Sequence, residues 1–209
     1  SPRLLLMDEP LAALDQARKH EVLPYLEQLC CQYNLPIVYV SHAADEVARL
    51  ADQLVLMEHG RVIASGPLAE VWSRLDLPAA QADDAAVVLE AVVTGRDTHY
   101  HLTQLCCAGG SLQLASHDEQ PGQRVRLRVQ ARDVSVALQC PQDSSISNVL
   151  AARVVEIAAA EHPAHVLVKL AAGDAFLLAR ITRRSCEQLQ LAPGCAVWAQ
   201  IKAVALLAG

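Results

Sequence analysis

Three residues that can act on a bound substrate follow two short apolar segments near the start of the sequence. Asp8 and Glu9 come directly after residues 4–7, and His42 comes soon after residues 37–40. Apolar runs of this length are typical of strands buried on both faces of a sheet. Ligands of open α/β sheets lie beyond the carboxyl ends of the strands, where one acid can face a metal ion and the next a water molecule. The pattern therefore places two acids, candidates for metal and water contact, at one edge of the expected sheet.

The elements expected around these residues alternate between strand and helix. A helical pattern opens at Asp15 and is broken by Asn34-Leu35-Pro36. After the strand at residues 37–40, we expect a short helix at residues 43–51 and a third strand at residues 54–57. This alternation predicts an α/β layer domain over the first third of the chain.

The same segments resemble motifs of the ATP-binding cassette (ABC) ATPases. Leu4-Leu5-Leu6-Met7-Asp8-Glu9-Pro10 and the following Leu11-Ala12-Ala13-Leu14-Asp15 are similar to the Walker B motif and the D-loop, and Ser41-His42 is similar to the switch-histidine segment. The resemblance implies that Asp8 holds Mg²⁺ through water and that Glu9 accepts a proton from the attacking water. It also implies that His42 hydrogen-bonds the γ-phosphate of ATP and that Asp15 couples two nucleotide sites across a dimer. A buried strand that ends in solvated acids is the alternative, and the ordered occurrence of all three motifs favours the cassette.

Other motifs of the cassette family do not occur in this sequence. It contains no G-x-x-x-x-G-K-[ST] phosphate loop, no Leu-Ser-Gly-Gly-Gln signature and no glutamine loop, all of which precede the Walker B strand in the family. The resemblance therefore implies that residues 1–82 are the C-terminal part of a P-loop ATPase domain. Backbone amides and a lysine that hold phosphates belong to the missing motifs. We expect the chain by itself neither to bind ATP with useful affinity nor to hydrolyse it.

The remainder of the sequence reads as an all-β region with an internal repeat. Pro121-Gly122-Gln123-Arg124-Val125 recurs as Pro193-Gly194-Cys195-Ala196-Val197 at an offset of 72 residues, and earlier segments match at offsets of 64 and 62. The change in offset assigns eight additional residues of the second copy to residues 181–191. The sequence thus predicts a shortened module at residues 83–141 and a fuller module at residues 142–209.

The second module resembles the molybdate-binding Mop (molbindin) domain. The segments that carry the resemblance are Ser145-Ile146-Ser147-Asn148-Val149-Leu150, Arg153-Val154-Val155-Glu156-Ile157, Val168-Lys169-Leu170, Ala179-Arg180-Ile181-Thr182, Leu191-Ala192-Pro193-Gly194 and Ile201-Lys202-Ala203. The resemblance implies a tandem of OB-like β modules that follows a partial P-loop ATPase domain of α/β class. Together the two resemblances imply the C-terminal part of the ATP-binding subunit of a molybdate importer.

A molybdate site needs hydrogen-bond donors, because the dianion offers only acceptor oxygens. The candidate donors are Ser145, Ser147, Asn148, Thr182, Ser185 and Lys202. Serine and asparagine before a strand are also ordinary turn formers, and a lysine can simply protect a strand edge. Free-standing molbindins carry arginine where Ser147 stands and threonine where Val204 stands. These departures favour weak molybdate binding, or a dimerising regulatory role for the module.

Charge and cysteine content restrict the class of protein further. The formal net charge is −6, which argues against binding to a nucleic-acid backbone, and charged residues interrupt every apolar stretch. Seven cysteines, four of them in adjacent pairs, are typical of reduced thiols in the cytosol. The resemblance implies a cytoplasmic subunit that lies on the inner face of the plasma membrane. It implies ATP, Mg²⁺ and molybdate as ligands, a homodimer, contact with membrane permease subunits and indirect action of a periplasmic molybdate-binding protein.

Two alternatives remain open at the level of sequence. In the first, the functional unit is the β tandem, an oxyanion-binding or storage module that carries a residual cassette. In the second, the cassette drives import of another cargo, because related accessory β domains occur on importers for sulfate, polyamines and sugars. The Ile181-Thr182…Ser185 run before Leu191 and Pro193-Gly194 favours molybdate.

Overall fold

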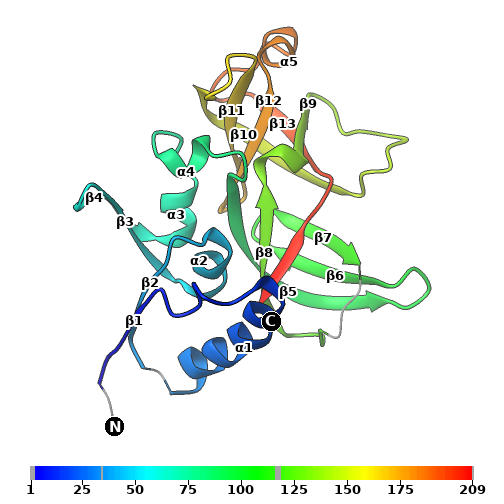
Figure 1. Cartoon of the computed structure of the whole chain (residues 1–209). Coiled ribbons are helices and arrows are strands. Elements are labelled where there is room, and N and C mark those ends of the chain that lie inside the picture. Colours follow the sequence, from blue (N-terminus) through cyan, green and yellow to red (C-terminus); the bar gives the residue numbers. More distant parts are fainter. Residues whose placement is uncertain (1–2, 34, 116–118, 209) are drawn as a thin grey trace. The chain divides into compact units, whose positions relative to one another are not determined.

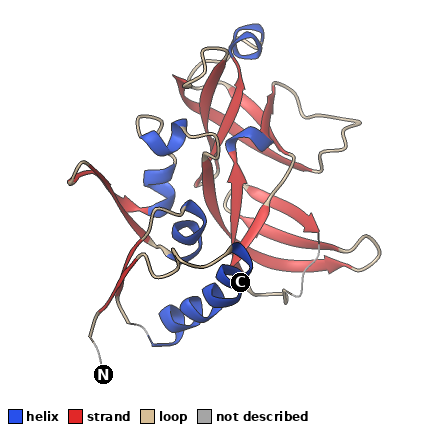
Figure 2. Ribbon diagram, viewed as in Figure 1, coloured by secondary structure: helices blue, strands red, loops and turns tan. Residues whose placement is uncertain are grey.

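The computed structural model describes residues 3–33, 35–115 and 119–208, and the chain is mostly β (Figure 1). By their internal contacts, residues 1–68 and residues 69–207 form two compact units. The helices and strands of both units are distinguished in Figure 2. Helix α3 (Leu68–Trp72) begins where the first unit ends.

The first unit contains two small sheets. Strands β1 (Leu5–Asp8) and β2 (Ile37–Val40) pair in parallel, with Leu5 opposite Ile37 and Asp8 opposite Val40. Parallel strands need a crossover connection, and helix α1 (Gln16–Tyr33) lies within it. Helix α2 (Ala44–Leu50) then leads to an antiparallel pair, β3 (Gln53–Glu58) and β4 (Arg61–Pro67). The expected succession of strands and helices is thus observed.

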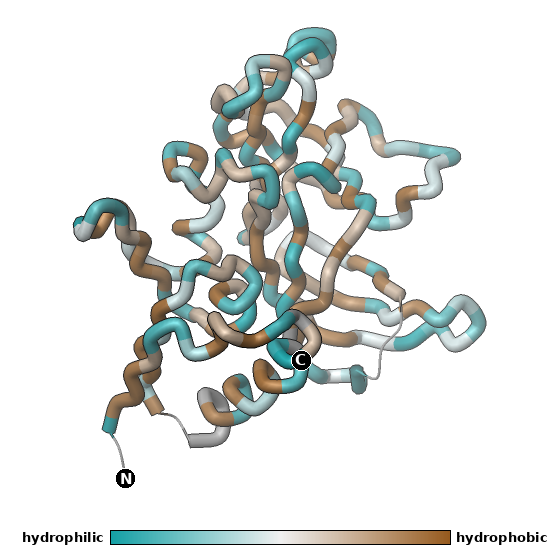
Figure 3. The backbone as a smooth tube through the Cα atoms, in the orientation of Figure 1, coloured by the Kyte–Doolittle hydropathy of each residue, from teal (hydrophilic) through white to brown (hydrophobic). Residues whose placement is uncertain are grey.

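One expectation for the first unit is wrong. Strands at residues 4–7 and 37–40 were predicted to be buried on both faces, but burial alternates along β1 and β2. Leu6 is 69% exposed, and Val38 and Val40 are each 50% exposed. Figure 3 shows both strands as hydrophobic tube segments. The physical reason is that no described part of the first unit covers this apolar face.

The second unit is built from two five-stranded antiparallel sheets. The first sheet has the order β14-β8-β5-β6-β7, and the second has the order β12-β11-β10-β13-β9. The strands of the first copy are β5 (Ala86–Asp97), β6 (Leu102–Cys107), β7 (Gly110–Ala115), β8 (Arg124–Gln130) and β9 (Val134–Ala137). Those of the second copy are β10 (Asn148–Ala159), β11 (His165–Ala172), β12 (Ala175–Thr182), β13 (Ala196–Ile201) and β14 (Ala205–Ala208).

The strands of the two copies correspond one to one, but each copy gives its last strand to the other sheet. Strand β9 pairs with β13 of the second copy, and β14 lies beside β8 of the first. The eight additional residues of the second copy contain helix α5 (Arg183–Gln188), which has no counterpart among the described residues of the first. Because the terminal strands are exchanged, neither sheet is complete without the other copy. The domain limits at residues 82 and 141 stay predictions.

Two arginines hold the segment that precedes the first β strand of the second unit. Helix α4 (Pro78–Gln81) leads into this segment. A guanidinium nitrogen of Arg180, in β12, donates to Asp83 Oδ1 at 2.9 Å, and another donates to the Gln81 carbonyl at 3.2 Å. Arg128, in β8, donates to the Asp84 carbonyl at 3.0 Å. Each β copy therefore contributes one cation to the same short segment.

One continuous core joins the two copies. It contains Leu105 and Leu127 of the first sheet together with Leu167 and Leu177 of the second, each at most 1% exposed. The turns at the ends of two hairpins also meet: a Cβ built at Gly173 would overlap the carbonyl oxygen of Ala108. The backbone of Gly173 has φ +57°, a left-handed conformation that glycine adopts without steric cost.

We predict that Gly173→Ala destabilises the second unit by about 2–5 kcal/mol, because a left-handed alanine costs about 1–2 kcal/mol and overpacking adds about 1–3 kcal/mol. Gly194→Ala is the matched control, since Gly194 also has positive φ (+91°) but no atom lies within 4 Å of the point that its Cβ would occupy. Urea unfolding of both variants, followed by circular dichroism, measures the difference. Equal losses of stability in the two variants would contradict the packing of these turns.

Candidate functional site

The parallel pairing of β1 with β2 brings the predicted catalytic residues to one edge of the sheet. The pairing continues beyond the strands, because the Glu9 amide donates to the Val40 carbonyl at 2.9 Å. Asp8 therefore ends β1 opposite Val40, and His42 follows β2 by two residues. The sequence prediction that Asp8, Glu9 and His42 share one edge agrees with this register.

A short hydrogen bond joins Glu9 and His42. The Nδ1 atom of His42 lies 2.7 Å from Oε1 of Glu9. The side chain of His42 is 82% exposed and that of Glu9 is 35% exposed, so both groups are accessible to a ligand. Glu9 has φ +46°, and left-handed backbone at a residue other than glycine is strained and concentrates at functional sites. The geometry gives one carboxylate and one imidazole positioned for proton transfer or for contact with an anion.

The two aspartates of the cassette prediction lie in different settings. Asp8 is exposed at the end of β1. Mg²⁺ keeps several of its waters and takes only one or two protein carboxylates, so an exposed Asp8 fits a water-mediated site. Asp15 caps α1, because its Oδ1 accepts from the Arg18 amide at 2.9 Å. Among the described residues, no group of three or more histidine, cysteine, aspartate or glutamate side chains is arranged to hold a metal ion.

A buried carboxylate that no sequence pattern predicted lies beside this edge. Glu46, in the first turn of α2, is only 3% exposed and accepts three hydrogen bonds. The donors are Lys19 Nζ at 2.7 Å, the Tyr39 hydroxyl at 2.7 Å and the Ser41 hydroxyl at 2.8 Å. The sequence feature that could have indicated this buried polar group was Tyr39, a hydroxyl-bearing side chain inside an otherwise aliphatic strand.

Asn148, a predicted oxyanion ligand, is bound to the backbone of the other β copy. Its Oδ1 accepts from the Gln113 amide at 2.7 Å, and its Nδ2 donates to the Gln113 carbonyl at 2.8 Å. Gln113 lies in β7, the edge strand of the first sheet. Asn148 is 7% exposed, so its side-chain amide occupies backbone hydrogen-bonding groups of this edge strand in a nearly buried position.

Thr182 and Ser185 form the start of α5. The Thr182 hydroxyl oxygen accepts from the Ser185 amide at 3.0 Å, and the two hydroxyl oxygens lie 2.7 Å apart. This is an N-cap arrangement, in which a side chain satisfies a helix amide. Of the six predicted oxyanion ligands, only these two share a hydrogen bond within the described part of the chain.

The three remaining candidates lie near the start of β10 and the end of β13. Ser145 and Ser147 are exposed before β10, and Lys202 is exposed directly after β13. Asn148 of β10 pairs with Ile201 of β13. Ser147 precedes Asn148 and Lys202 follows Ile201, so both residues lie next to this pair. Val204, where molbindins carry threonine, is half-buried and packs against the core.

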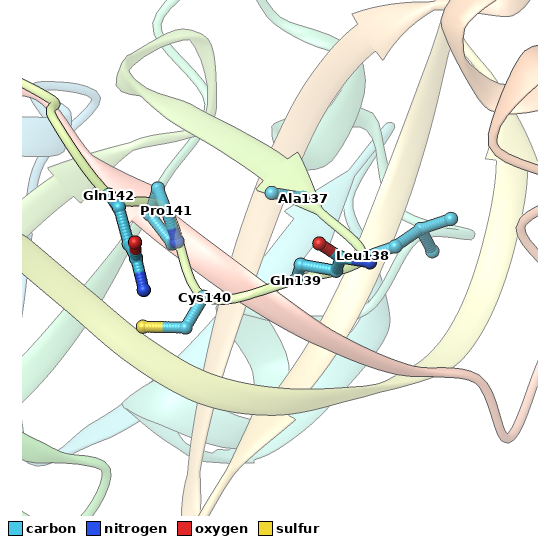
Figure 4. Close-up of a pocket in the computed structure, with 6 residues that line it drawn as sticks. All are labelled: Ala137, Leu138, Gln139, Cys140, Pro141 and Gln142. Atoms are coloured by element: carbon cyan, nitrogen blue, oxygen red, sulfur yellow. The ribbon is translucent and has the colours of Figure 1, made fainter.

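A cavity lies beside the connection between β9 and β10 (Figure 4). Its volume is about 620 Å³, and its lining residues are Ala137, Leu138, Gln139, Cys140, Pro141 and Gln142. None of the predicted site residues lines it. The presence of this cavity therefore gives no reason to place the oxyanion-binding site in it.

Comparisons with known proteins relate the whole chain to one group. Residues 144–208 match the model of the TOBE domain. The chain is 60% identical over 207 residues to the molybdenum import ATP-binding protein ModC 1 of Azotobacter vinelandii, and the match covers 99% of this chain and 57% of the relative. It is 59% identical over 210 residues to the molybdenum import ATP-binding protein ModC of Bordetella parapertussis, with 100% and 57% coverage. The chain thus spans a little over half the length of these relatives.

A solved structure also resembles part of the chain. It is the cytoplasmic molybdate-binding protein ModG with molybdate bound, at 22% identity and a TM-score of 0.49, and the match covers 57% of this chain and 93% of that one. A likeness of this degree supports no conclusion about the site. Within residues 3–33, 35–115 and 119–208, none of the helices combines the length and the apolar character needed to cross a membrane.

We predict that Asn148→Ala lowers the free energy of unfolding by about 1–3 kcal/mol, because it leaves the Gln113 amide and carbonyl without their partner. Asn148→Asp keeps the acceptor but places a carboxylate oxygen against the Gln113 carbonyl in a nearly buried site, so at neutral pH it should cost at least as much as Asn148→Ala. Ser145→Ala is the control, since substitution of an exposed residue usually changes stability by less than about 0.5 kcal/mol. If thermal unfolding of Asn148→Ala and Ser145→Ala is indistinguishable, the bond to Gln113 does not contribute as described.

Proposed function

Because this chain is related along its whole length to molybdenum import ATP-binding proteins, we propose that it is the C-terminal part of the ATP-hydrolysing subunit of an ABC importer for molybdate. In this proposal residues 1–82 belong to a P-loop ATPase domain of α/β class. Residues 83–141 and 142–209 are two Mop-like modules that together form a regulatory oxyanion-binding domain. The observation that carries the proposal is the contact between Glu9 and His42 at the common edge of β1 and β2.

The proposed reaction is hydrolysis of ATP to ADP and phosphate. Glu9 accepts a proton from the water whose oxygen attacks the γ-phosphorus, and the bond from that phosphorus to the β–γ bridging oxygen breaks. With both ring nitrogens protonated, His42 donates to Glu9 through Nδ1 and to a γ-phosphate oxygen through Nε2. Asp8 would hold Mg²⁺ through water, and the ion would supply positive charge that stabilises the phosphates. Asp15 couples this site to a second copy across a homodimer.

The exposed apolar face of the first unit supports an incomplete ATPase domain. Leu6, Val38 and Val40 lie on that face, and Val55 and Met57 of β3 are 57% and 59% exposed. A soluble protein rarely leaves so many large apolar side chains uncovered on the strands of one small unit. The relatives are longer than this chain, and we propose that the residues that hold the nucleotide phosphates lie in their additional length. The chain by itself therefore neither binds ATP with useful affinity nor hydrolyses it.

We propose that the second unit (residues 69–207, the β unit) senses the transported oxyanion. Ser145, Ser147 and Lys202 are exposed donors, and no described hydrogen bond occupies their side chains. Asn148, Thr182 and Ser185 complete the proposed ligand set from positions where their side chains also hold backbone groups. A hydroxyl that caps a helix can still donate its proton to an anion.

The proposal fixes partners and location. The subunit acts as a homodimer in the cytoplasm, on the inner face of the plasma membrane, and contacts membrane permease subunits. A periplasmic molybdate-binding protein delivers the oxyanion to those permease subunits and acts on this chain only indirectly. Nucleic acid is not a partner, in keeping with the net charge of −6.

A second candidate function follows from the separate core of the β unit. Its buried residues form one continuous cluster without any contribution from the first 68 residues. A storage or binding module for molybdate needs only that unit. Cargo other than molybdate, such as sulfate, a polyamine or a sugar, is the remaining alternative for the transporter.

The full-length parent is the longer ATP-hydrolysing subunit of which this chain is proposed to be the C-terminal part. We predict that Glu9→Gln in the full-length parent lowers Mg²⁺-dependent phosphate release by about 100-fold or more, because it removes the general base. ATP binding, measured with a fluorescent analogue, should persist. Glu21→Gln changes an exposed acid on α1 and should leave the rate unaltered. Phosphate release from the 209-residue chain alone, abolished by Glu9→Gln, would overturn the assignment of the chain as an incomplete ATPase.

We predict that calorimetric titration of the chain with molybdate releases heat and that titration with sulfate releases less, because the proposed ligand of this unit is molybdate. Lys202→Ala removes the proposed cation and should weaken molybdate binding by about tenfold, a loss typical of a charge-assisted hydrogen bond of about 1.5 kcal/mol. Lys169→Ala, which removes a lysine that stacks on Phe176, serves as the control. Absence of heat with both anions excludes the oxyanion function, and equal heats exclude its selectivity.

A further inference from the structure

Glu46 lies at the centre of a polar network that links three elements of the first unit. Lys19 comes from α1, Tyr39 from β2, and Ser41 from the connection between β2 and α2 (Figure 1). The side chain of Lys19 is 19% exposed, and that of Glu46 is 3% exposed. A carboxylate this deeply buried is costly unless donors surround it, and the three donors satisfy that condition.

The carboxyl group of Glu46 is charged in the folded protein. Burial alone would raise its pKa, but the hydrogen bonds from Lys19, Tyr39 and Ser41 outweigh burial and hold the pKa below its usual value. Burial raises the pKa of Tyr39 far above its ordinary value, and the hydrogen bond to Glu46 and the charges of Glu46 and Glu9 raise it further. The Tyr39 hydroxyl therefore stays protonated and is subject to the negative charge of both Glu46 and Glu9.

The network reaches the backbone on both sides of His42. The Ser41 hydroxyl donates to Glu46, and its oxygen also accepts from the Ala43 amide at 3.1 Å. His42 lies between these two residues, and its exposed side chain is held by Glu9 alone among the described side chains. Through Ser41, the Glu46 carboxylate thus contacts the backbone segment that carries His42.

We propose that Glu46 is a positioning residue that sets the imidazole of His42 against Glu9. The inference rests on the proposed function for its catalytic meaning, since a mispositioned His42 would fail to reach the γ-phosphate. Glu46 itself touches neither substrate nor the reacting water, because its carboxylate is enclosed by Lys19, Tyr39 and Ser41.

A purely structural role is the competing explanation, and the chain provides a matched control. Arg49 in α2 forms an ion pair with Glu27 in α1, with side chains 15% and 17% exposed. That pair joins the same two helices as the pair of Lys19 with Glu46. Glu27→Gln and Glu46→Gln therefore both remove one largely buried charge from the contact between α1 and α2, but only the second change affects the neighbours of His42.

The test measures the imidazole ¹⁵N signals of His42 by NMR in the 209-residue chain. Glu9→Gln supplies the reference signal of an imidazole without its carboxylate partner. We expect Glu46→Gln to move the Nδ1 signal at least halfway to that reference and to speed hydrogen exchange of the Ala43 amide at least tenfold. Glu27→Gln should leave both unchanged. If Glu46→Gln leaves the Nδ1 signal unchanged, or if Glu27→Gln moves it equally, the proposal is overturned.

A second variant decides the matter if Glu46→Gln does not fold. Ser41→Ala removes the link between Glu46 and the Ala43 amide while Lys19 and Tyr39 still satisfy the buried carboxylate. The Nδ1 signal of His42 should then move toward the reference, and an unmoved signal rejects the proposal.

Activity of the full-length parent separates this inference from the proposed function. Glu46→Gln should lower kcat for ATP hydrolysis at least tenfold with KM for ATP unchanged, because the nucleotide still binds but His42 is displaced. If Glu9→Gln leaves hydrolysis intact while the Nδ1 signal responds to Glu46→Gln as expected, the proposed function fails and the positioning role stands. An altered KM with unchanged kcat would reject the positioning role.

Discussion

The parallel pairing of β1 with β2 is the constraint on which the proposed chemistry depends. Its register sets Asp8 opposite Val40, and the bond from the Glu9 amide to the Val40 carbonyl carries the pairing one residue past the strand. That extension fixes Glu9 in a left-handed conformation and brings its carboxylate to His42. A shift of one residue would turn these side chains to the opposite face of the sheet. The strain at Glu9 persists because the surrounding hydrogen bonds determine the geometry.

A second constraint organises the β unit. The terminal strands β9 and β14 are exchanged between the two sheets, and the Asn148 side chain bonds the backbone of β7 across the copies. The two copies therefore share one core and are expected to respond to a ligand together. Arg128 and Arg180 extend this coupling to the segment before β5, since each copy holds that segment with one cation.

Local patterns in the sequence predicted the local elements and their order. The apolar runs before Asp8 and His42, the cap at Asp15 and the repeated Pro-Gly turns each mark a feature formed within a few residues. Contacts between distant residues left no such trace. Asn148 and Gln113 are 35 residues apart and Lys19 and Glu46 are 27 apart, so periodicity does not report their pairing. The prediction that β1 is buried on both faces was wrong. An apolar run shows that the side chains of a strand favour burial, but it does not show which segment covers them.

In the proposed function, His42 senses the γ-phosphate at the edge formed by β1 and β2. The most direct measurement is the imidazole ¹⁵N spectrum of His42 in the full-length parent with Glu9 intact, recorded with a non-hydrolysable ATP analogue so that no turnover occurs. We predict that the ATP analogue with Mg²⁺ shifts the Nε2 signal and that ADP with Mg²⁺ leaves it in place. A His42 signal that responds equally to the analogue and to ADP, or to neither, would contradict a contact between His42 and the γ-phosphate.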